Sequence, residues 1–193
     1  MFLLHRPDRH IIDRFLCESA ELPLSYSPIG LVHGATHPYD VDVTEVVVGH
    51  GQTDFDRARG ALLSWTQFKI GWVELFPQAA PVEPGTVVAV LANHFGFWSL
   101  SGCRVVYVLD GDDTRCGFAY GTLTNHVESG EELFELEFDR GTGGVTYRIR
   151  AASRPRAVIA RLGYPIARSL QARFRRDSAE AMRRCTIADR GIS

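Results

Sequence analysis

Three residues of types that can move protons lie within a span of 13 positions: Tyr120, His126 and Glu132. Histidine titrates near neutral pH, a glutamate beside it can hold its ring, and a tyrosine hydroxyl can hydrogen-bond a carbonyl, so all three are candidate catalytic residues. Their stretch, CGFAYGTLTNHVESGEELFELEF, also has the polar and glycine content of a turn that joins two strands. Both interpretations stay open, because acid–base chemistry requires the three side chains to share one cleft.

Large rings accompany this stretch, and a ring-lined cleft is the usual form of a small-molecule site. The alternative is that the rings fill the core and leave no cavity. Arg154 follows the last expected strand, where its donors could meet a polar ligand group. The residues expected to bind a ligand are Trp65, Phe68, Trp72, His94, Phe95, Trp98, Tyr107, Phe118, Tyr120, Tyr147 and Arg154.

The elements that must position these residues can be read from hydrophobic periodicity. Apolar residues at helical spacing predict a helix over residues 8–20, followed by an extended lead-in to residue 40. The β-branched run VTEVVVG predicts a strand. A second helix is expected over residues 53–68, where Thr53 and Asp56 resemble a capping box.

Strands dominate the middle of the chain. TVVAVLA, CRVVYVLD and GFAYGTLT read as strands, and residues 134–138 and 145–150 alternate apolar and charged side chains on either side of the glycine-rich turn DRGTGG. This pattern predicts a hairpin with glutamates and arginines paired across its outer face.

The C-terminal part reads as a long helix. It begins at Val158, is interrupted at GYP, and carries Ile166, Leu170, Phe174 and Met182 on one face. We therefore expect an α+β fold, a strongly curved antiparallel sheet wrapped around a long C-terminal helix. One domain is expected over residues 1–193: an N-terminal helix and lead-in (1–40), a core (41–184) and a flexible tail (185–193).

Composition excludes several classes of function. A formal charge of −2 gives no case for nucleic acid or an anionic membrane as partner, and no apolar run reaches the roughly 20 residues that span a bilayer. The N-terminal stretch MFLLHRPDRH has charged residues after only four positions, which is too early for the apolar segment of a secretory signal.

The four widely spaced cysteines suggest buried free thiols and a cytoplasmic protein. We expect no metal and no cofactor, since ligand spacings, a GxGxxG motif and a GxSxG motif are absent from the sequence.

Charge is unevenly distributed. Residues 150–184 hold ten arginines and two carboxylates, a net charge of +8, and the rest of the chain carries −10. The arginines could pair with the acidic sheet of the same molecule, meet an acidic partner protein, or hold a phosphate-bearing ligand at the edge of the helix.

Three blocks of sequence resemble a known family. VGHGQTDFDRARGALLSWTQFKIGWVEL, GFAYGTLTNHVESGEELFELEF and SRPRAVIARLGYPIARSLQARFRRD are similar to the signature blocks of the DUF1990 family, also called UPF0548. The likeness extends from about Tyr26 to Met182. It implies a START/Bet v 1-like (SRPBCC) helix-grip fold, whose members often hold lipids, hormones or polyketides; the family supplies no established catalytic residue.

Three hypotheses for function follow. The first is a non-enzymatic binder of a small apolar or amphipathic molecule (lipid, isoprenoid or polyketide-like). The second is a cyclase-, isomerase- or hydrolase-like enzyme that uses Tyr120, His126 or Glu132. The third is an interaction protein that uses the arginine-rich helix. No stable membrane insertion is expected, and a homodimer is possible.

Overall fold

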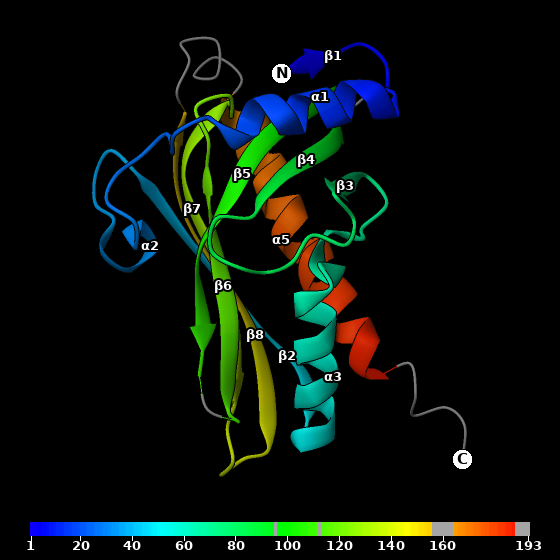
Figure 1. The fold of residues 1–193 in the computed structure, drawn as a ribbon. Coiled ribbons are helices and arrows are strands. Elements are labelled where there is room, and N and C mark those ends of the chain that lie inside the picture. The colour runs from blue at the N-terminus through cyan, green and yellow to red at the C-terminus, as the bar shows by residue number, and fades with distance from the viewer. Residues whose placement is uncertain (95, 112, 156–163, 188–193) are drawn as a thin grey trace.

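A single antiparallel sheet forms the framework of the molecule (Figure 1). The computed structural model describes residues 1–94, 96–111, 113–155 and 164–187. The sheet has the order β2-β8-β7-β6-β5-β4-β3, with β1 paired to β5. The strands are β1 (Phe2–Leu3), β2 (Asp40–His50), β3 (Val73–Phe76), β4 (Val87–His94), β5 (Phe97–Asp110), β6 (Arg115–Thr122), β7 (Glu128–Phe138) and β8 (Gly144–Pro155).

Helices lie on both faces of this sheet. They are α1 (Arg9–Ala20), α2 (Leu31–Gly34), α3 (Gln52–Leu63), the short 3₁₀ helix η1 (Thr66–Phe68) and α5 (Tyr164–Ile187). We call the face that packs against α3, η1 and α5 the inner face, and the opposite face, which α1 and α2 cover, the outer face. The curved sheet holding α5 is the helix-grip architecture, so the predicted fold class is confirmed.

Alternation along β7 decides which side chains reach the inner face. Phe134 and Leu136 belong to the inner core and are fully buried, whereas Leu133 packs into a cluster on the outer face. By the two-residue period of a strand, Glu132 shares the inner face with Phe134, and Glu131 and Glu135 lie outside. The predicted hairpin is confirmed, with Glu135 directly opposite Arg148 and bound to it.

Aromatic rings fill the part of the inner face beside α3 and η1. The rings of Trp65 and Phe118 are 4.8 Å apart, those of Phe68 and Phe134 5.6 Å, and those of Phe68 and Phe174 of α5 5.2 Å. Edge-to-face and tilted pairs at these distances are typical of a packed interior. This part of the grip is therefore core rather than open space.

The predicted helix over residues 53–68 is wrong at its end. Helix α3 stops at Leu63, and Trp65 adopts a left-handed backbone with φ of 57°. This turn buries the indole, whose Nε1 donates to the carbonyl oxygen of Ala80 at 2.8 Å. The capping box is also wrong: Gly51 caps the helix, and Asp54 instead accepts a hydrogen bond from the amide of His50 at 2.8 Å.

The C-terminal helix runs further than the predicted core. It continues to Ile187, and the hydroxyl of the buried Thr186 donates to the carbonyl oxygen of Val48, which ties the last turn of the helix to β2. The predicted helical start at Val158 and the break at GYP up to residue 163 lie outside the described residues. All four cysteines are free, and Cys17 is exposed rather than buried. None of the helices in the described ranges is both long and apolar enough to span a bilayer.

Candidate functional site

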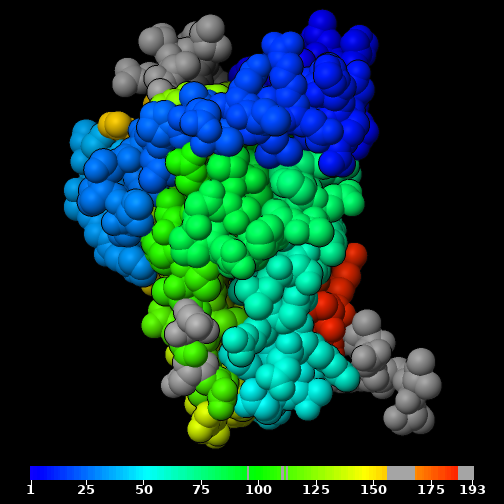
Figure 2. All heavy atoms as spheres, viewed as in Figure 1, coloured from blue at the N-terminus to red at the C-terminus, as the bar shows by residue number. Residues whose placement is uncertain are grey.

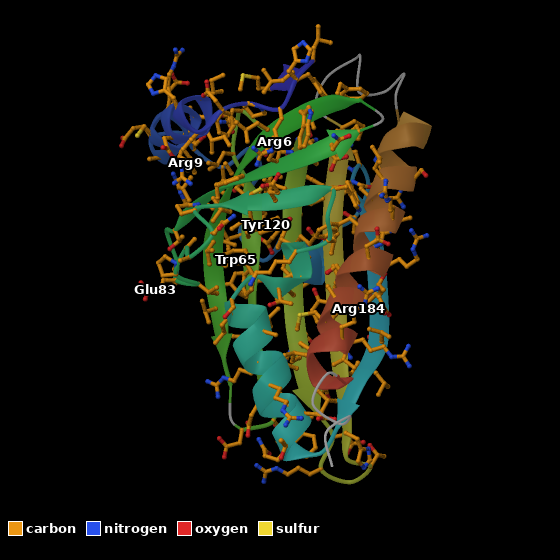
Figure 3. The ribbon with its side chains drawn as sticks, turned by 90° about the vertical axis from the view of Figure 1, so that its right-hand side faces the viewer. Arg6, Arg9, Trp65, Glu83, Tyr120 and Arg184 are labelled. Atoms are coloured by element: carbon orange, nitrogen blue, oxygen red, sulfur yellow. The ribbon has the colours of Figure 1, made fainter. Side chains whose placement is uncertain are left out.

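Tyr120 and Glu132 form a hydrogen-bonded pair on the inner face. They stand opposite each other in the register of β6 and β7, and the Tyr120 hydroxyl donates to Oε2 of Glu132 at 2.7 Å. Figure 3 labels Tyr120 and Trp65 in the middle of the molecule, and both belong to the core of the inner face. Two of the three candidate catalytic residues are therefore in contact.

The surroundings of this pair favour the neutral carboxyl. Burial raises the pKa of Glu132 to about 7, and the neighbouring charges of Glu128 and Asp42 add to that rise, against the opposing effects of Tyr120 and Arg175. Burial and Glu132 likewise raise the pKa of Tyr120. Glu132 nevertheless keeps some accessible surface, whereas its neighbours Glu131 and Leu133 are buried. The site thus holds a carboxyl that changes charge near neutral pH.

A second glutamate lies at the beginning of β7. Nε2 of Gln171, on α5, is 2.9 and 2.8 Å from the two carboxylate oxygens of Glu128 and 3.2 Å from Oγ of Ser153. Burial raises the pKa of Glu128 as well, although its contact with Gln171 and the charge of Arg168 oppose the shift. The helix therefore meets the sheet here through polar contacts rather than apolar ones.

Asp42 of β2 extends this polar cluster to the sheet edge. It accepts a hydrogen bond from Nη2 of Arg168 at 2.8 Å and forms an ion pair with Arg175 at 3.3 Å. Burial opposes ionisation of Asp42, but the two guanidiniums outweigh it and lower its pKa. We call Asp42, Tyr120, Glu128, Glu132, Ser153, Arg168, Gln171 and Arg175 the inner polar cluster.

Other arginines of α5 bind within the helix itself. Arg173 and Arg176 each pair with Asp177, and Arg184 pairs with Glu180. Together with the contacts of Asp42, these pairs support the interpretation that the basic helix is balanced inside the molecule.

His126 lies in the turn between β6 and β7. Its Nδ1 accepts a hydrogen bond from the amide of Glu128 at 3.0 Å, and its own amide donates to the carbonyl oxygen of Leu123 at 2.9 Å. These contacts belong to the strand-joining turn that the composition of the stretch suggested. Neither of them brings His126 to Tyr120 or Glu132.

Tyr107 lies on the outer face. Its hydroxyl donates to Glu131 at 3.3 Å, and Glu131 also accepts from the hydroxyl of Tyr26 at 2.6 Å and the amide of Gly30 at 2.9 Å. These contacts anchor the lead-in that covers this face. A β-bulge between Val105 and Tyr107 shifts the alternation at this point.

Four of the aromatic residues predicted to bind a ligand lie in the core of the inner face. Trp65, Phe68, Phe118 and Tyr147 are buried in the inner core. The hydroxyl of Tyr147 lies 3.0 Å from Oγ of Ser178. Of these four rings, Phe68 reaches the inner polar cluster, with its centroid 6.0 Å from that of Tyr120.

Trp72 and His94 lie together near the end of β4. The Trp72 indole donates to Asp177 at 3.0 Å, and its ring lies 6.3 Å from that of His94. Nε2 of His94 is 2.7 Å from Oγ of Ser99, and burial lowers the pKa of the imidazole. His94 is thus a hydrogen-bonded histidine at the rim of the inner face.

The last three predicted ligand residues lie elsewhere. Trp98 packs beside α1 on the outer face, with the guanidinium of Arg6 6.0 Å from its ring centroid. Arg154 stacks over Tyr39 of the lead-in at 4.8 Å. Phe95 lies outside the described residues. Figure 2 shows how the N-terminal segment covers one end of the strands.

Sequence reasoning missed Asp42 and Gln171, and it did not single out Arg168 and Arg175 among the arginines of the helix. Asp42 interrupts a β-branched strand with a charge at an inward position, and this is the signal that could have identified it. Gln171 carried no such signal, because a glutamine on an arginine-rich helix resembles any solvated residue.

A groove of about 590 Å³ lies between β2 and α5. Thr44, Glu45 and Val46 line one side, and the other side is lined by helical residues Ala172, Arg175, Arg176, Asp177, Ala179, Glu180 and Arg183. Arg175 belongs both to this groove and to the inner polar cluster, where it contacts Asp42. The groove therefore adjoins the cluster through one side chain.

Solved structures share this fold. The di-domain ARO/CYC StfQ from the steffimycin biosynthetic pathway matches with a TM-score of 0.53 and 8% identity, covering 80% of this chain and 52% of that one. Norcoclaurine synthase from Thalictrum flavum, in complex with dopamine and hydroxybenzaldehyde, matches with a TM-score of 0.52 and 9% identity, covering 88% and 97%. At these identities the likeness concerns the fold alone.

Sequence relatives are much closer. A UPF0548 protein of Dictyostelium discoideum is 31% identical over 213 residues, which cover 100% of this chain and 99% of the relative. The family described as "Domain of unknown function (DUF1990)" matches residues 25–181, in agreement with the resemblance noted from the three sequence blocks. The chain therefore belongs to the DUF1990 family.

Proposed function

We propose that this protein binds a small amphipathic molecule between the inner face of the sheet and α5, with the polar part of the molecule at the Tyr120–Glu132 pair. The observation that carries the proposal is a carboxyl group that is largely desolvated yet keeps accessible surface within the grip. Keeping such a group costs folding free energy, and groups of this kind concentrate at functional sites.

The surroundings of the Tyr120–Glu132 pair suit a molecule that has one polar end and one apolar end. Phe174 of α5 is partly accessible and packs against the buried ring of Phe68, which provides an apolar surface close to Gln171. Small aromatic molecules occupy norcoclaurine synthase, which shares this fold. That likeness supports a small-molecule site of this general kind and leaves the identity of the ligand to experiment.

Two measurements test the proposal. Native mass spectrometry of protein purified without added ligand reveals a retained small molecule, and a thermal-shift screen with fatty acids, isoprenoids and aromatic polyketides reveals binding. We expect a ligand from these classes to raise the melting temperature. Ser153→Leu places a larger side chain beside Gln171 and should reduce the shift.

Thr146→Leu is the matched control, because it makes a comparable change on the same strand at a position facing away from α5. A native mass equal to that of the bare chain, together with no thermal shift from any of the three classes, would contradict the proposal.

A second candidate function is proton transfer to or from the bound molecule. The pKa of about 7 for Glu132 favours it, because a general acid or base works best when its pKa lies near the working pH. In this version Glu132 exchanges the proton and Tyr120 holds the carboxyl. Incubation of an identified carbonyl ligand in D₂O should exchange the hydrogens next to its carbonyl, and Glu132→Gln should abolish the exchange. Equal exchange in Glu132→Gln would remove the enzymatic candidate and leave binding intact.

A further inference from the structure

Hydrogen-bond acceptors outnumber donors where Glu128 and Glu132 face α5. Their four carboxylate oxygens receive the Tyr120 hydroxyl and the Gln171 amide group. Gln171 also contacts Ser153, so its two N–H groups are shared among three acceptor atoms. Within the described part of the chain, Oε1 of Glu132 has no hydrogen-bond partner, and the residue keeps accessible surface. This oxygen is therefore an acceptor that a donor on a bound molecule could reach.

The nearby cations are already engaged. Arg168 and Arg175 both bind Asp42, and Arg168 also donates to Oε1 of Gln171 at 3.1 Å. Farther along α5, Arg173 stacks over the ring of Trp72 at 4.5 Å and pairs with Asp177. An incoming anion would therefore have to break an existing ion pair, and it would meet the carboxylates of Glu128 and Glu132.

The charge of the inner polar cluster leads to the same ligand class. Three carboxyl groups, those of Asp42, Glu128 and Glu132, stand against two guanidiniums. The charges balance while Glu132 is neutral, and ionisation of all three carboxyls leaves the cluster one positive charge short. A bound cation would restore neutrality, and its N–H groups would supply the donors that Glu132 lacks.

We infer that the ligand presents a protonated amine to Oε1 of Glu132, with the apolar remainder of the molecule toward Phe174. This inference rests on the function proposed above and specifies its ligand class, an amphipathic amine.

Matched probes test the inference. On one aromatic skeleton the probes are 3-phenylpropylamine, 3-phenylpropanol and 3-phenylpropionate; on one alkyl skeleton they are dodecylamine, dodecanol and laurate, below their micellar concentrations. Affinities are measured at pH 7.5 by titration calorimetry. One added charge-assisted hydrogen bond corresponds to about tenfold or more in affinity, so the amine should bind at least about tenfold tighter than the acid of the same skeleton.

Two variants assign the preference to Glu132. Glu132→Gln keeps the shape and removes the charge, and it should bring the preference of amine over acid below about threefold. Tyr147→Phe removes a hydroxyl on the same face that contacts Ser178 and leaves the Tyr120–Glu132 pair in place, so it should retain the preference for amine. Glu137→Gln, an exposed glutamate on the same strand, is the control and should bind as the unmodified protein does. Each variant is first checked for native circular dichroism.

The outcomes separate the inference from the proposed function. Equal or tighter binding of the acid, or an amine preference that survives in Glu132→Gln, overturns the amine inference while small-molecule binding stands. If the six probes and the broader screen all fail to bind, the proposed function itself falls and the inference falls with it.

Discussion

Tyr120 and Glu132 face each other across β6 and β7, 12 residues apart in the chain and joined by a hydrogen bond of 2.7 Å. The pair lies where the inner face changes from packed rings to polar groups. Its position connects the stability of the sheet to the charge state of one carboxyl.

The first consequence concerns stability against pH. The pKa of Glu132 is about 7 in the folded protein and 4.5 in an ordinary setting, so the folded state binds more protons between these values and stability falls as pH rises from about 4.5 to 7. Glu132→Gln should remove this loss and be more stable than the unmodified protein at pH 8, by up to about 3 kcal/mol. The difference should vanish near pH 4.

Urea unfolding followed by circular dichroism at both pH values measures this effect. The pKa of Glu128 is also raised, so the variant should keep a weaker slope in the same direction. Glu137→Gln serves as the control on the same strand. A Glu132→Gln variant that is less stable at pH 8 would show that the carboxylate stabilises the fold, contrary to this account.

The second consequence concerns the Tyr120 hydroxyl. It donates to the carboxylate and thereby holds the pKa of Glu132 below the value that burial alone would set. Tyr120→Phe should therefore raise that pKa, which carboxyl ¹³C NMR titration can measure. Tyr147→Phe is the control, because that tyrosine lies on the same face but contacts Ser178 instead. An unchanged or lowered pKa in Tyr120→Phe would contradict the hydrogen bond.

A third prediction concerns how α5 is held against the sheet. Asp42→Asn weakens the attachment of both Arg168 and Arg175, and it should cost about 2 kcal/mol, less than the loss of a fully buried pair because the Asp42 side chain is 16% exposed. Asp13→Asn breaks an exposed helical pair with Arg9 and should cost less than about 0.5 kcal/mol. Denaturant unfolding compares them. Equal costs would show that the Asp42 contacts contribute no more than surface pairs.

A fourth prediction concerns the segment of residues 22–39 that covers the outer face. Glu131, 2% exposed, accepts from the Tyr26 hydroxyl and the Gly30 amide. Glu131→Ala leaves these donors without their acceptor, at a cost of about 3 kcal/mol, and should expose residues 22–39 to limited proteolysis. Glu137→Ala is the comparison. A cleavage pattern identical to that of the unmodified protein would contradict this role for Glu131.

The sequence alone was sufficient for most of the architecture. Alternation at Phe134 and Leu136, and the charge pair of Glu135 and Arg148, predicted the β7–β8 hairpin because a strand's two-residue period is visible in the order of side chains. The apolar stripe of the C-terminal part predicted α5 for the corresponding reason at helical period. Family resemblance agreed with both, and the match over residues 25–181 confirms it.

Local patterns were insufficient where a distant contact decides the backbone. The helix prediction over residues 53–68 extended past Leu63, because the residues beyond it keep helical spacing while the Trp65 indole turns the chain to reach Ala80. Periodicity records which face a residue occupies, and it holds no information about a hydrogen bond formed 15 residues away.

The candidate site shows the same division. Composition singled out Tyr120, His126 and Glu132 together, but strand register pairs the first with the third and leaves His126 in the turn. Asp42 reaches Arg168, and Glu128 reaches Gln171, only because α5 crosses the inner face of the sheet. Residue types are a property of the chain, whereas the burial and mutual distances that set the pKa of Glu132 exist only after distant segments pack together.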